Sequence, residues 1–564
     1  YNIKNSSKRN RIFQEREFFM RSFTCCYHRD HGTMDLHTES YTCLLRSRDG
    51  ILRCFAKGSP YADLLLSPDA GTELAPGRFV LEQEPEECCG EREKMELVFR
   101  CENSIRTTLT FYSDRIEFKA ERTGGEVFLP DNFYLGRGSK LFSDRLFTPS
   151  WPDRTLPIGH YLRREEPVQL SPGLMSPAPW CFSARQENGR WMGFELEPED
   201  HEFDFYEFDS QPGSGHDFCW NVGYKGYKAP CRTLSVPALV LRFDLADEFE
   251  IFTRHAETIV STGRFRPSLR KNPAWHTGVA LCGWRLQKSR QDLCTEERYE
   301  SMIRQLESKG LDFDILILDD FWGDPKTHGI WKSDPRKWPD LRAFIDRRHA
   351  EGRRVLLWLC TYASGLPEEE KLDGNMQNPD SPAWRNRLRE DAHRLLSDDP
   401  GCFNADGIKY DFTSLIPKVP GQCSVCGVGF IRERFRLVYE AMTAVKPDAQ
   451  ILCQSLNPYF TPWQTMIRLN DFTALPEHGL EEMRIRARIA KAVGYGLPID
   501  PDHVSYGLFS YRGGYDFFRE MESLGSVSLY VNEEDLEDAE LLDILIPLVR
   551  RNLHRSHSTP NRNG

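Results

Sequence analysis

The sequence has little that would suit a nucleic-acid-binding or membrane protein. Its 564 residues carry a net charge of −12, whereas binding to phosphates needs clustered Lys and Arg. No apolar run approaches the ~18 residues of a membrane-spanning helix. Internal repeats and low-complexity segments are also missing. With 40% hydrophobic and 28% charged residues, we expect a soluble globular protein that binds neither nucleic acid nor a membrane.

A regular cysteine pattern is also lacking. The 17 cysteines are an odd number, and many, such as Cys282, Cys360 and Cys453, lie in apolar runs, as is typical of small buried hydrophobes in a reducing cytosol. Cys423-Ser-Val-Cys426 has the spacing of a zinc knuckle. A structural zinc needs four ligands, and no second Cys or His pair accompanies this one. A plain cysteine pair is therefore favoured over a metal site.

The length predicts more than one domain. Residues 1–34 lack the apolar stretch of a signal peptide, and we expect them to be a disordered extension of a cytoplasmic protein. Residues 35–250 alternate short β-type runs with Gly-, Pro- and Asp-containing turns, which predicts a large β-sandwich. Residues 251–274 have helical periodicity and form a linker. Residues 275–556 alternate strands with amphipathic helices, and residues 557–564 form a polar tail.

The third region contains eight β/α units, the number found in a (β/α)8 TIM barrel. The predicted strands are 277–284, 313–321, 354–362, 407–412, 450–455, 466–472, 497–504 and 527–531. The predicted helices between most of them are 297–309, 341–352, 384–396, 430–445 and 480–493, and a last one covers 541–553.

The fourth predicted strand ends in Lys409-Tyr-Asp411. Because side chains alternate along a strand, Lys409 and Asp411 point to the same side. An ammonium beside a carboxylate keeps that carboxylate ionised. An ionised carboxylate at the C-terminal end of a barrel strand suits a glycosidase nucleophile, although a structural Lys–Asp pair would leave the same pattern.

Charged and aromatic residues gather at the ends of the other strands as well. Carboxylates accept hydrogen bonds from vicinal hydroxyls, lysine donates to hydroxyl oxygens, and aromatic rings offer apolar platforms, so the set suits a polyol. Any single aspartate among them could equally be a helix N-cap. The residues concerned are Trp284, Asp319, Asp320, Trp322, Trp358, Arg468, Asp471, Asp502 and His503.

These motifs resemble clan D of the glycoside hydrolases, which contains the melibiase-type α-galactosidases and related α-glucosidases. Ile317-Leu-Asp-Asp-Phe-Trp322 is similar to the Asp-Asp-Gly-Trp strand end of that group, and Lys409-Tyr-Asp411 to its Lys-x-Asp nucleophile motif. Arg468-Leu-Asn-Asp471 falls where the acid/base aspartate is expected, and His503-Val-Ser505 resembles the end of strand seven.

The resemblance implies retaining hydrolysis of an α-linked terminal sugar by an exo-acting enzyme, without cofactor or metal. Asp411 would attack the anomeric carbon, and Asp471 would protonate the leaving oxygen and then deprotonate water. Their carboxyls are then expected roughly 5–7 Å apart. Asp319, Asp320 and Lys409 would bind sugar hydroxyls, so the partner is an oligosaccharide or glycoside; a homo-oligomer is compatible with the sequence.

The sugar is left open by two departures from melibiases. Cys453 is followed by Gln-Ser-Leu-Asn-Pro instead of a glycine-rich segment, and Leu359-Cys-Thr-Tyr-Ala stands in place of a Glu-Pro-Glu run. A galactoside is the preferred substrate, with an α-glucosidase or α-xylosidase as the alternative.

Two further readings stay open. One is a catalytically silent carbohydrate-binding protein. The other is a different barrel enzyme that holds a divalent ion on Asp500, Asp502 and His503. We also expect the sandwich to pack on the mouth of the barrel, where the loop around Trp151 is a candidate contributor to the sugar site.

Overall fold

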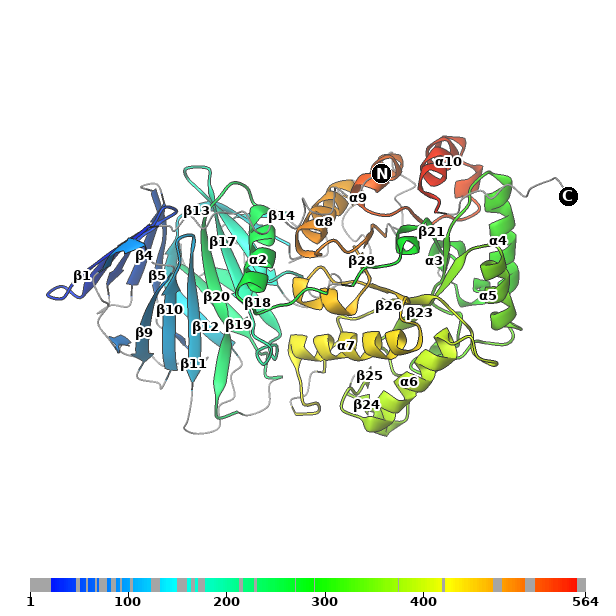
Figure 1. Ribbon diagram of the computed structural model, residues 1–564, viewed down its shortest axis with the longest axis horizontal. Helices are drawn as coiled ribbons and strands as arrows, with labels where there is room; N and C mark the ends of the chain where they lie inside the picture. The colour runs from blue at the N-terminus through cyan, green and yellow to red at the C-terminus, as the bar shows by residue number, and fades with distance from the viewer. Residues whose placement is uncertain are drawn as a thin grey trace, which may run out of the picture.

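The computed structural model describes part of the chain. The ranges are residues 22–46, 51–56, 59–65, 68–69, 79–82, 88–91, 94–101, 105–122, 132–149, 160–163, 168–170, 178–212, 217–227, 231–268, 270–288, 290–373, 375–417, 421–469, 479–502 and 513–554. Two bodies lie side by side, an N-terminal β-domain and a C-terminal barrel, with helix α2 (Glu250–Ser261) at the seam between them (Figure 1). This confirms the predicted fold class.

The β-domain consists of two antiparallel sheets. In order across the sheet, the first contains β15 (Val168–Leu170), β18 (Glu207–Pro212), β19 (Asp217–Gly223), β12 (Asn132–Leu141), β5 (Ser59–Leu65), β4 (Ile51–Ala56), β3 (Thr42–Arg46), β2 (Thr33–His37), β1 (Ser22–His28) and β8 (Cys88–Glu91), with β6 (Pro68–Asp69) paired to β12. The second contains β14 (His160–Arg163), β13 (Ser143–Thr148), β16 (Cys181–Gln186), β17 (Trp191–Glu197), β20 (Leu234–Leu245), β11 (Arg115–Arg122), β10 (Ile105–Phe111), β9 (Met95–Cys101) and β7 (Phe79–Leu81).

The two sheets share an apolar core. Phe194 of the second sheet contacts Trp220 of the first with ring centroids 5.5 Å apart, and Phe182 contacts Phe208 at 5.9 Å. The first sheet begins before the expected boundary at residue 35, because β1 pairs with both β2 and β8. Residues 22–34 therefore belong to this sheet and not to an extension.

The barrel is a parallel sheet whose strands follow chain order. They are β21 (Ala280–Cys282), β22 (Ile315–Leu318), β23 (Arg354–Cys360), β26 (Gly407–Asp411), β27 (Gln450–Cys453), β28 (Met466–Arg468), β29 (Ile499–Asp500) and β30 (Ser528–Leu529), which pairs back onto β21. The circle is nearly closed, since the Ser526 N–H donates to the Ile499 carbonyl at 2.8 Å. Each observed strand lies inside its predicted range.

Helices cover the outside of the barrel. They are α3 (Gly283–Leu286), α4 (Glu296–Ser308), α5 (Leu341–Ala350), α6 (Pro382–Leu396), α7 (Gly427–Val445), α8 (Gly479–Val493), α9 (Gly513–Leu524) and α10 (Ala539–Asn552), while a 3-10 helix, η5 (Pro458–Trp463), joins β27 to β28 and a small hairpin, β24 (Lys371–Leu372) and β25 (Met376–Gln377), precedes α6. Local sequence sets several helix starts: Thr295, Asp340 and Ser381 accept hydrogen bonds from first-turn N–H groups, as N-cap residues do.

The seam between the two bodies is closed by aromatic packing and by backbone hydrogen bonds. Tyr459 of η5 lies 5.6 Å from Trp180 and 5.3 Å from Phe203 of the β-domain, measured between ring centroids. Cys426, the N-cap of α7, makes no side-chain cap. Instead, the loop of residues 203–205 accepts from the first N–H groups of this helix, for example from Val428 to the Phe205 carbonyl at 2.7 Å.

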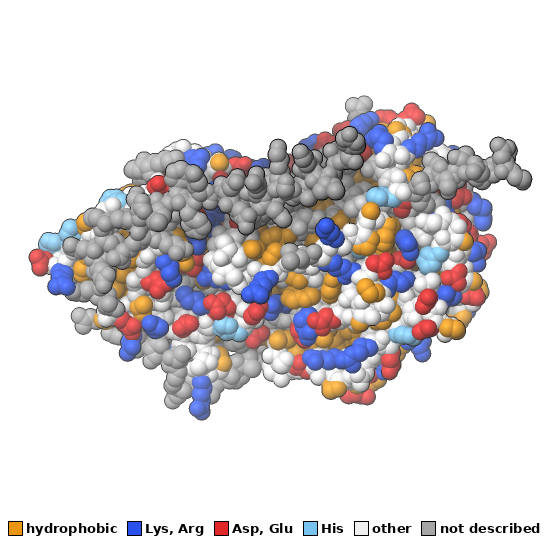
Figure 2. All heavy atoms as spheres, in the orientation of Figure 1, with side chains coloured by type: hydrophobic (Ala, Val, Ile, Leu, Met, Phe, Trp, Pro, Cys, Tyr) orange, Lys and Arg blue, Asp and Glu red, His pale blue; other side chains and the backbone are white. Residues whose placement is uncertain are grey.

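Within the described ranges, none of the helices has the length and apolarity needed to cross a membrane. Basic and acidic side chains are interspersed over the described part of the face shown in Figure 2.

Candidate active site

The predicted nucleophile, Asp411, is the last residue of β26 and points into a ring of polar partners at the C-terminal mouth of the barrel. Its Oδ2 accepts from the Trp358 indole N–H at 3.1 Å. Its Oδ1 accepts from the Phe412 N–H at 2.9 Å and from Arg468 at 3.2 Å. The side chain is 16% exposed, so it is held firmly and is still reachable from outside.

Arg468, at the end of β28, joins three neighbouring strands. Besides Asp411, it donates to Gln454 Oε1 at 2.7 Å and forms an ion pair with Asp502. Asp502 is buried, and its N–H donates to Asp500 Oδ1 at 3.0 Å. The sequence placed Arg468 and Asp502 among the site residues. Gln454 was not among them, although it follows directly after β27.

A second buried ion pair lies on the other side of the barrel mouth. Lys409 Nζ lies 2.7 Å from Asp319 Oδ2, and the Cys282 thiol donates to the same oxygen at 2.9 Å. The sequence correctly brings Lys409 and Asp319 into one site, but it places the ammonium beside Asp411. In the structure Lys409 bonds Asp319, because β22 and β26 both flank β23 and the two side chains meet across it.

These charges fix the ionisation of the two central groups. Burial acts to raise the pKa of Asp411, but Arg468 and, at longer range, Lys409 outweigh it and hold the pKa below its ordinary value of 3.8. Burial acts to lower the pKa of Lys409, but Asp319 outweighs it and raises the pKa. At neutral pH the site therefore contains a carboxylate anion at Asp411 and an ammonium at Lys409.

The remaining predicted residues that the structure describes take different places. Asp320 is half-buried with its Oδ1 3.6 Å from His328 Nε2. Trp284 stacks on Phe321 with ring centroids 5.9 Å apart. Trp322 is fully buried, and its indole N–H donates to the Trp358 carbonyl at 2.8 Å. The only polar atom of its side chain thus joins the loop after β22 to β23, so it has none to offer a substrate.

Three predictions fall on parts of the chain that the structure does not describe. Asp471, His503 and Trp151 lie outside the described residues. The expected distance between Asp411 and Asp471, and the place of the loop around Trp151, stay predictions.

Sequence reasoning missed an aromatic cluster at the mouth of the barrel. His328 lies 6.0 Å from Trp331 and 6.2 Å from Tyr362, in both cases with nearly parallel rings. Tyr362 in turn lies 5.2 Å from Phe412. Asp320, His328, Trp331 and Trp358 also line one narrow pocket. Trp358 is among the predicted site residues, whereas for His328, Tyr362 and Phe412 the only signal in the sequence is the general abundance of aromatic residues.

A larger cavity, of about 810 Å³, lies away from the barrel mouth, between the β-domain and the segment after α2. Its lining includes Tyr112, Arg115, His201 and Arg264. The Arg115 guanidinium carbon sits 3.7 Å above the centre of the Tyr112 ring, so one face of this aromatic ring is already covered. Size alone therefore does not make this cavity the active site.

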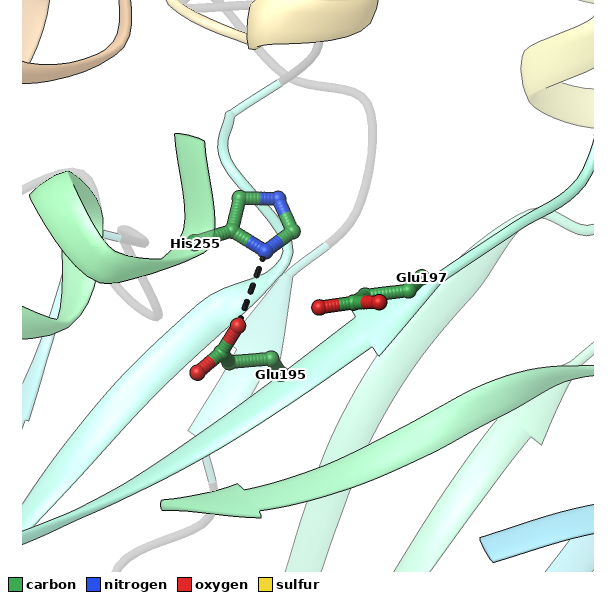
Figure 3. A group of neighbouring side chains, drawn as sticks. All are labelled: Glu195, Glu197 and His255. Carbon is green, nitrogen blue, oxygen red and sulfur yellow. Dashed lines mark hydrogen bonds and ion pairs between the residues drawn. The ribbon is translucent and has the colours of Figure 1, made fainter. Parts of the chain in front are cut away.

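One buried group of side chains has ligand types that suit a metal ion. Glu195 and Glu197 of β17 and His255 of α2 point toward one another, with ligand atoms within 4.8 Å (Figure 3). His255 Nδ1 lies 3.2 Å from Glu195 Oε2. Each carboxylate, however, also binds an arginine: Arg242 Nε reaches Glu195 at 2.6 Å and Arg264 reaches Glu197 at 2.5 Å.

Charge balance favours a proton over a metal ion in this group, which we call the seam cluster. Asp114 and Glu117 complete four carboxylates, and Arg115 a third guanidinium. Among these carboxylates and guanidiniums one negative charge is left over, which one proton neutralises and a divalent ion would overshoot. Burial raises the pKa of Glu197 to about 8, whereas at Glu195 Arg242 and the hydrogen bond with His255 outweigh burial and lower the pKa to about 2.

Comparison with known proteins agrees with the fold of the barrel. Residues 270–394 match the family model described as the glycosyl hydrolases family 31 TIM-barrel domain. A search of curated protein sequences found no match.

Solved structures share the fold at low identity. A family 31 sulfoquinovosidase from E. rectale, in complex with an aza-sugar inhibitor, is 13% identical with a TM-score of 0.56, over 89% of this chain and 81% of that one. A family 36 α-galactosidase from Geobacillus stearothermophilus with raffinose is 12% identical with a TM-score of 0.51, over 92% and 86%. An α-galactosidase from Thermus thermophilus with stachyose is 13% identical with a TM-score of 0.50, over 77% and 97%.

Proposed function

Because the chain carries a glycosyl hydrolase family 31 TIM-barrel domain, we propose that it is a retaining, exo-acting α-glycosidase. The observation that carries the proposal is the state of Asp411. It is an ionised carboxylate at the end of a barrel strand, oriented by Trp358 and Arg468. Such a group can attack an anomeric carbon and form a covalent glycosyl-enzyme, which water then hydrolyses.

The proton chemistry is assigned to Asp471. This assignment rests on the resemblance of Arg468-Leu-Asn-Asp471 to the acid/base segment of clan D. Asp471 would protonate the leaving oxygen in the first step and deprotonate water in the second. Asp319 and Lys409, which bond each other across the barrel mouth, would exchange part of that bond for sugar hydroxyls.

The preferred sugar is an α-galactoside, and a second candidate has its own support. The matching family model describes family 31, whereas the two α-galactosidases among the similar structures share the fold at 12–13% identity. An α-glucosidase or α-xylosidase is therefore the alternative. A catalytically silent carbohydrate-binding protein would keep the fold and lack turnover.

The test is a panel of 4-nitrophenyl glycosides with a stereochemical readout. We expect turnover of one or more of the α-galactoside, α-glucoside and α-xyloside, and none of the matching β-glycosides. NMR of the first-formed product should show the α-anomer, as retention requires. A β-anomer would refute the double displacement, and an inactive protein that still binds the sugars would support the silent alternative.

The role of Asp471 has a separate test. Asp471→Asn should lose most activity on methyl α-glycosides and keep much of it on 4-nitrophenyl α-glycosides, because a good leaving group needs little protonation. Asp411→Asn is the matched control, since the same change at the nucleophile should abolish turnover of both substrates. Equal losses on both substrates in the Asp471 variant would remove Asp471 from the acid role.

A further inference from the structure

One aromatic ring at the barrel mouth is left open to solvent. Phe412 directly follows Asp411 and is 41% exposed. Of the large hydrophobic residues that the structure describes, only Val80, Val260 and Phe412 are exposed, and the first two lie in β7 and α2, outside the barrel. A single exposed hydrophobic residue is not by itself a binding site, so the backbone and the neighbours of Phe412 have to show whether its exposure has a use.

The backbone holds this ring outward at an energetic cost. Phe412 has a φ of +51°, a conformation that bulky residues rarely adopt and that clusters at functional sites. Both of its peptide groups are fixed: its N–H donates to Asp411 Oδ1 at 2.9 Å, and its carbonyl accepts from Thr361 Oγ1 at 2.5 Å. The strained residue, Phe412, is therefore part of the turn whose N–H group orients the Asp411 carboxylate.

A similar turn at β22 provides the comparison. Phe321 has a φ of +75° and donates its N–H to Asp320 Oδ1 at 2.6 Å. Its ring, however, is stacked by Trp284 at 5.9 Å. Phe412 contacts Tyr362 at 5.2 Å and meets Trp358 edge-on at 6.2 Å, and the rest of its ring stays open. The two turns thus have similar backbone geometry, but the ring of Phe321 is covered and the ring of Phe412 is not.

The place of Phe412 at the end of the strand indicates what would cover the ring. It is the first residue after β26, where the chain leaves the barrel at its mouth, and it is 41% exposed, whereas the Asp411 side chain is 16% exposed. Its ring therefore lies on the solvent side of the Asp411 carboxylate, which as the proposed nucleophile contacts the anomeric carbon. In an exo-acting enzyme the terminal sugar lies on the inner side of that carbon and the leaving group on the outer side.

We propose that Phe412, backed by Tyr362, is the platform that binds the leaving group of the substrate, either the apolar face of the next sugar or an aromatic aglycone. This inference rests on the proposed glycosidase activity. Stacking of a ring on an aromatic face is worth about 3- to 10-fold in binding. Phe412 would thus select among aglycones and leave the choice of the terminal sugar to the inner residues.

The experiment compares substrates that share the sugar and differ in the leaving group. In Phe412→Leu, kcat/KM for the 4-nitrophenyl α-glycoside should fall about 3- to 10-fold, while kcat/KM for the α-glycosyl fluoride, which has no ring to stack, should stay within about twofold. Phe412→Trp keeps an aromatic face and should restore the ratio. Val260→Ala, an exposed hydrophobic residue in α2 at 38% exposure, is the control and should change neither.

A binding measurement separates this inference from the proposed function. Calorimetric titration of Asp411→Asn with the 4-nitrophenyl and the methyl α-glycoside needs no turnover, and the preference for the aryl ligand should shrink when Phe412→Leu is added. An equal loss on both substrates or both ligands would show that Phe412 acts only through Asp411 and would overturn the platform. The wild-type protein could bind the aryl ligand more tightly through Phe412 and yet hydrolyse no substrate. In that case the platform stands and the glycosidase proposal falls.

Discussion

The stability of this protein should decrease as the pH rises, because burial favours the neutral form of Glu197 in the seam cluster. An ordinary glutamate has a pKa of 4.5, and burial raises that of Glu197 to about 8. The neutral form is therefore favoured in the folded state. Its contribution to the free energy of unfolding is fully present below pH 4.5, declines as the pH rises, and is lost above pH 8.

The size of the effect follows from the two pKa values. At ~1.36 kcal/mol per pH unit, the interval from 4.5 to about 8 corresponds to about 3–5 kcal/mol. Glu197→Gln removes the titration and keeps the shape of the side chain, and Arg264 keeps its second partner, Glu117, at 2.9 Å. The free energy of unfolding of the variant should therefore rise relative to wild type by about 3–5 kcal/mol between pH 5 and pH 9.

The matched control lies two residues away on the same strand. The pKa of Glu195 is lowered to about 2, so its contribution is present above pH 4.5 and is lost only as the pH falls toward 2. Glu195→Gln should therefore destabilise the protein by about 3 kcal/mol to a similar extent at pH 5 and pH 9. Urea unfolding followed by tryptophan fluorescence at pH 5, 7 and 9 measures both variants. Parallel pH curves for wild type and Glu197→Gln would show that Glu197 is ionised throughout and would refute the reasoning.

Four further outcomes can be checked on the same protein. Asp411→Asn should lower kcat by about 10⁴-fold or more with an unchanged circular dichroism spectrum; substantial residual turnover would exclude it as nucleophile. Arg468→Met should move the acid limb of the kcat/KM profile to higher pH, because Arg468 holds the pKa of Asp411 down; an unmoved limb would contradict this. Gly427→Ala should cost about 2 kcal/mol or more, since its Cβ would lie 2.0 Å from the Phe205 carbonyl oxygen; Gly401→Ala, which also has a positive φ (+86° against +54°) but lies in open space, is the control for the conformational part. Dialysis against EDTA should leave kcat unchanged, and a loss restored by a divalent ion would favour a metal at the end of β29.

Much of the barrel could be predicted from the sequence because hydrophobic periodicity and helix caps are local signals. The predicted strand ends ran too long for a physical reason. Phe321 and Phe412 are apolar and follow buried strands, so they continue the strand pattern, yet their positive φ values turn them out of the sheet. Helix α9 was missed because it begins with Gly513 and Gly514, which are poor helix formers.

The pairing of charges within the site could not be predicted from spacing alone. The alternation of side chains correctly predicts that Lys409 and Asp411 share one face. The partner of each, however, lies on a different strand, and spacing along one strand does not identify it. Lys409 bonds Asp319, and Asp411 bonds Arg468 and Trp358. Nothing local to Arg468 distinguishes Asp411 from the other carboxylates around the barrel mouth.

The backbone cap at the start of α7 links the order of synthesis to the assembly of the barrel around β26. Residues 203–205 leave the ribosome more than 200 residues before the helix whose first N–H groups they accept, and Gly427 is the position where the two backbones meet without room for a Cβ. Domains generally fold from the N-terminus during synthesis, so the sandwich can present a finished acceptor site to the emerging helix. Since α7 directly follows the β26 loop, an isolated barrel would release that helix start with its donors unpaired. The two domains are thus poor modules for separate expression or exchange.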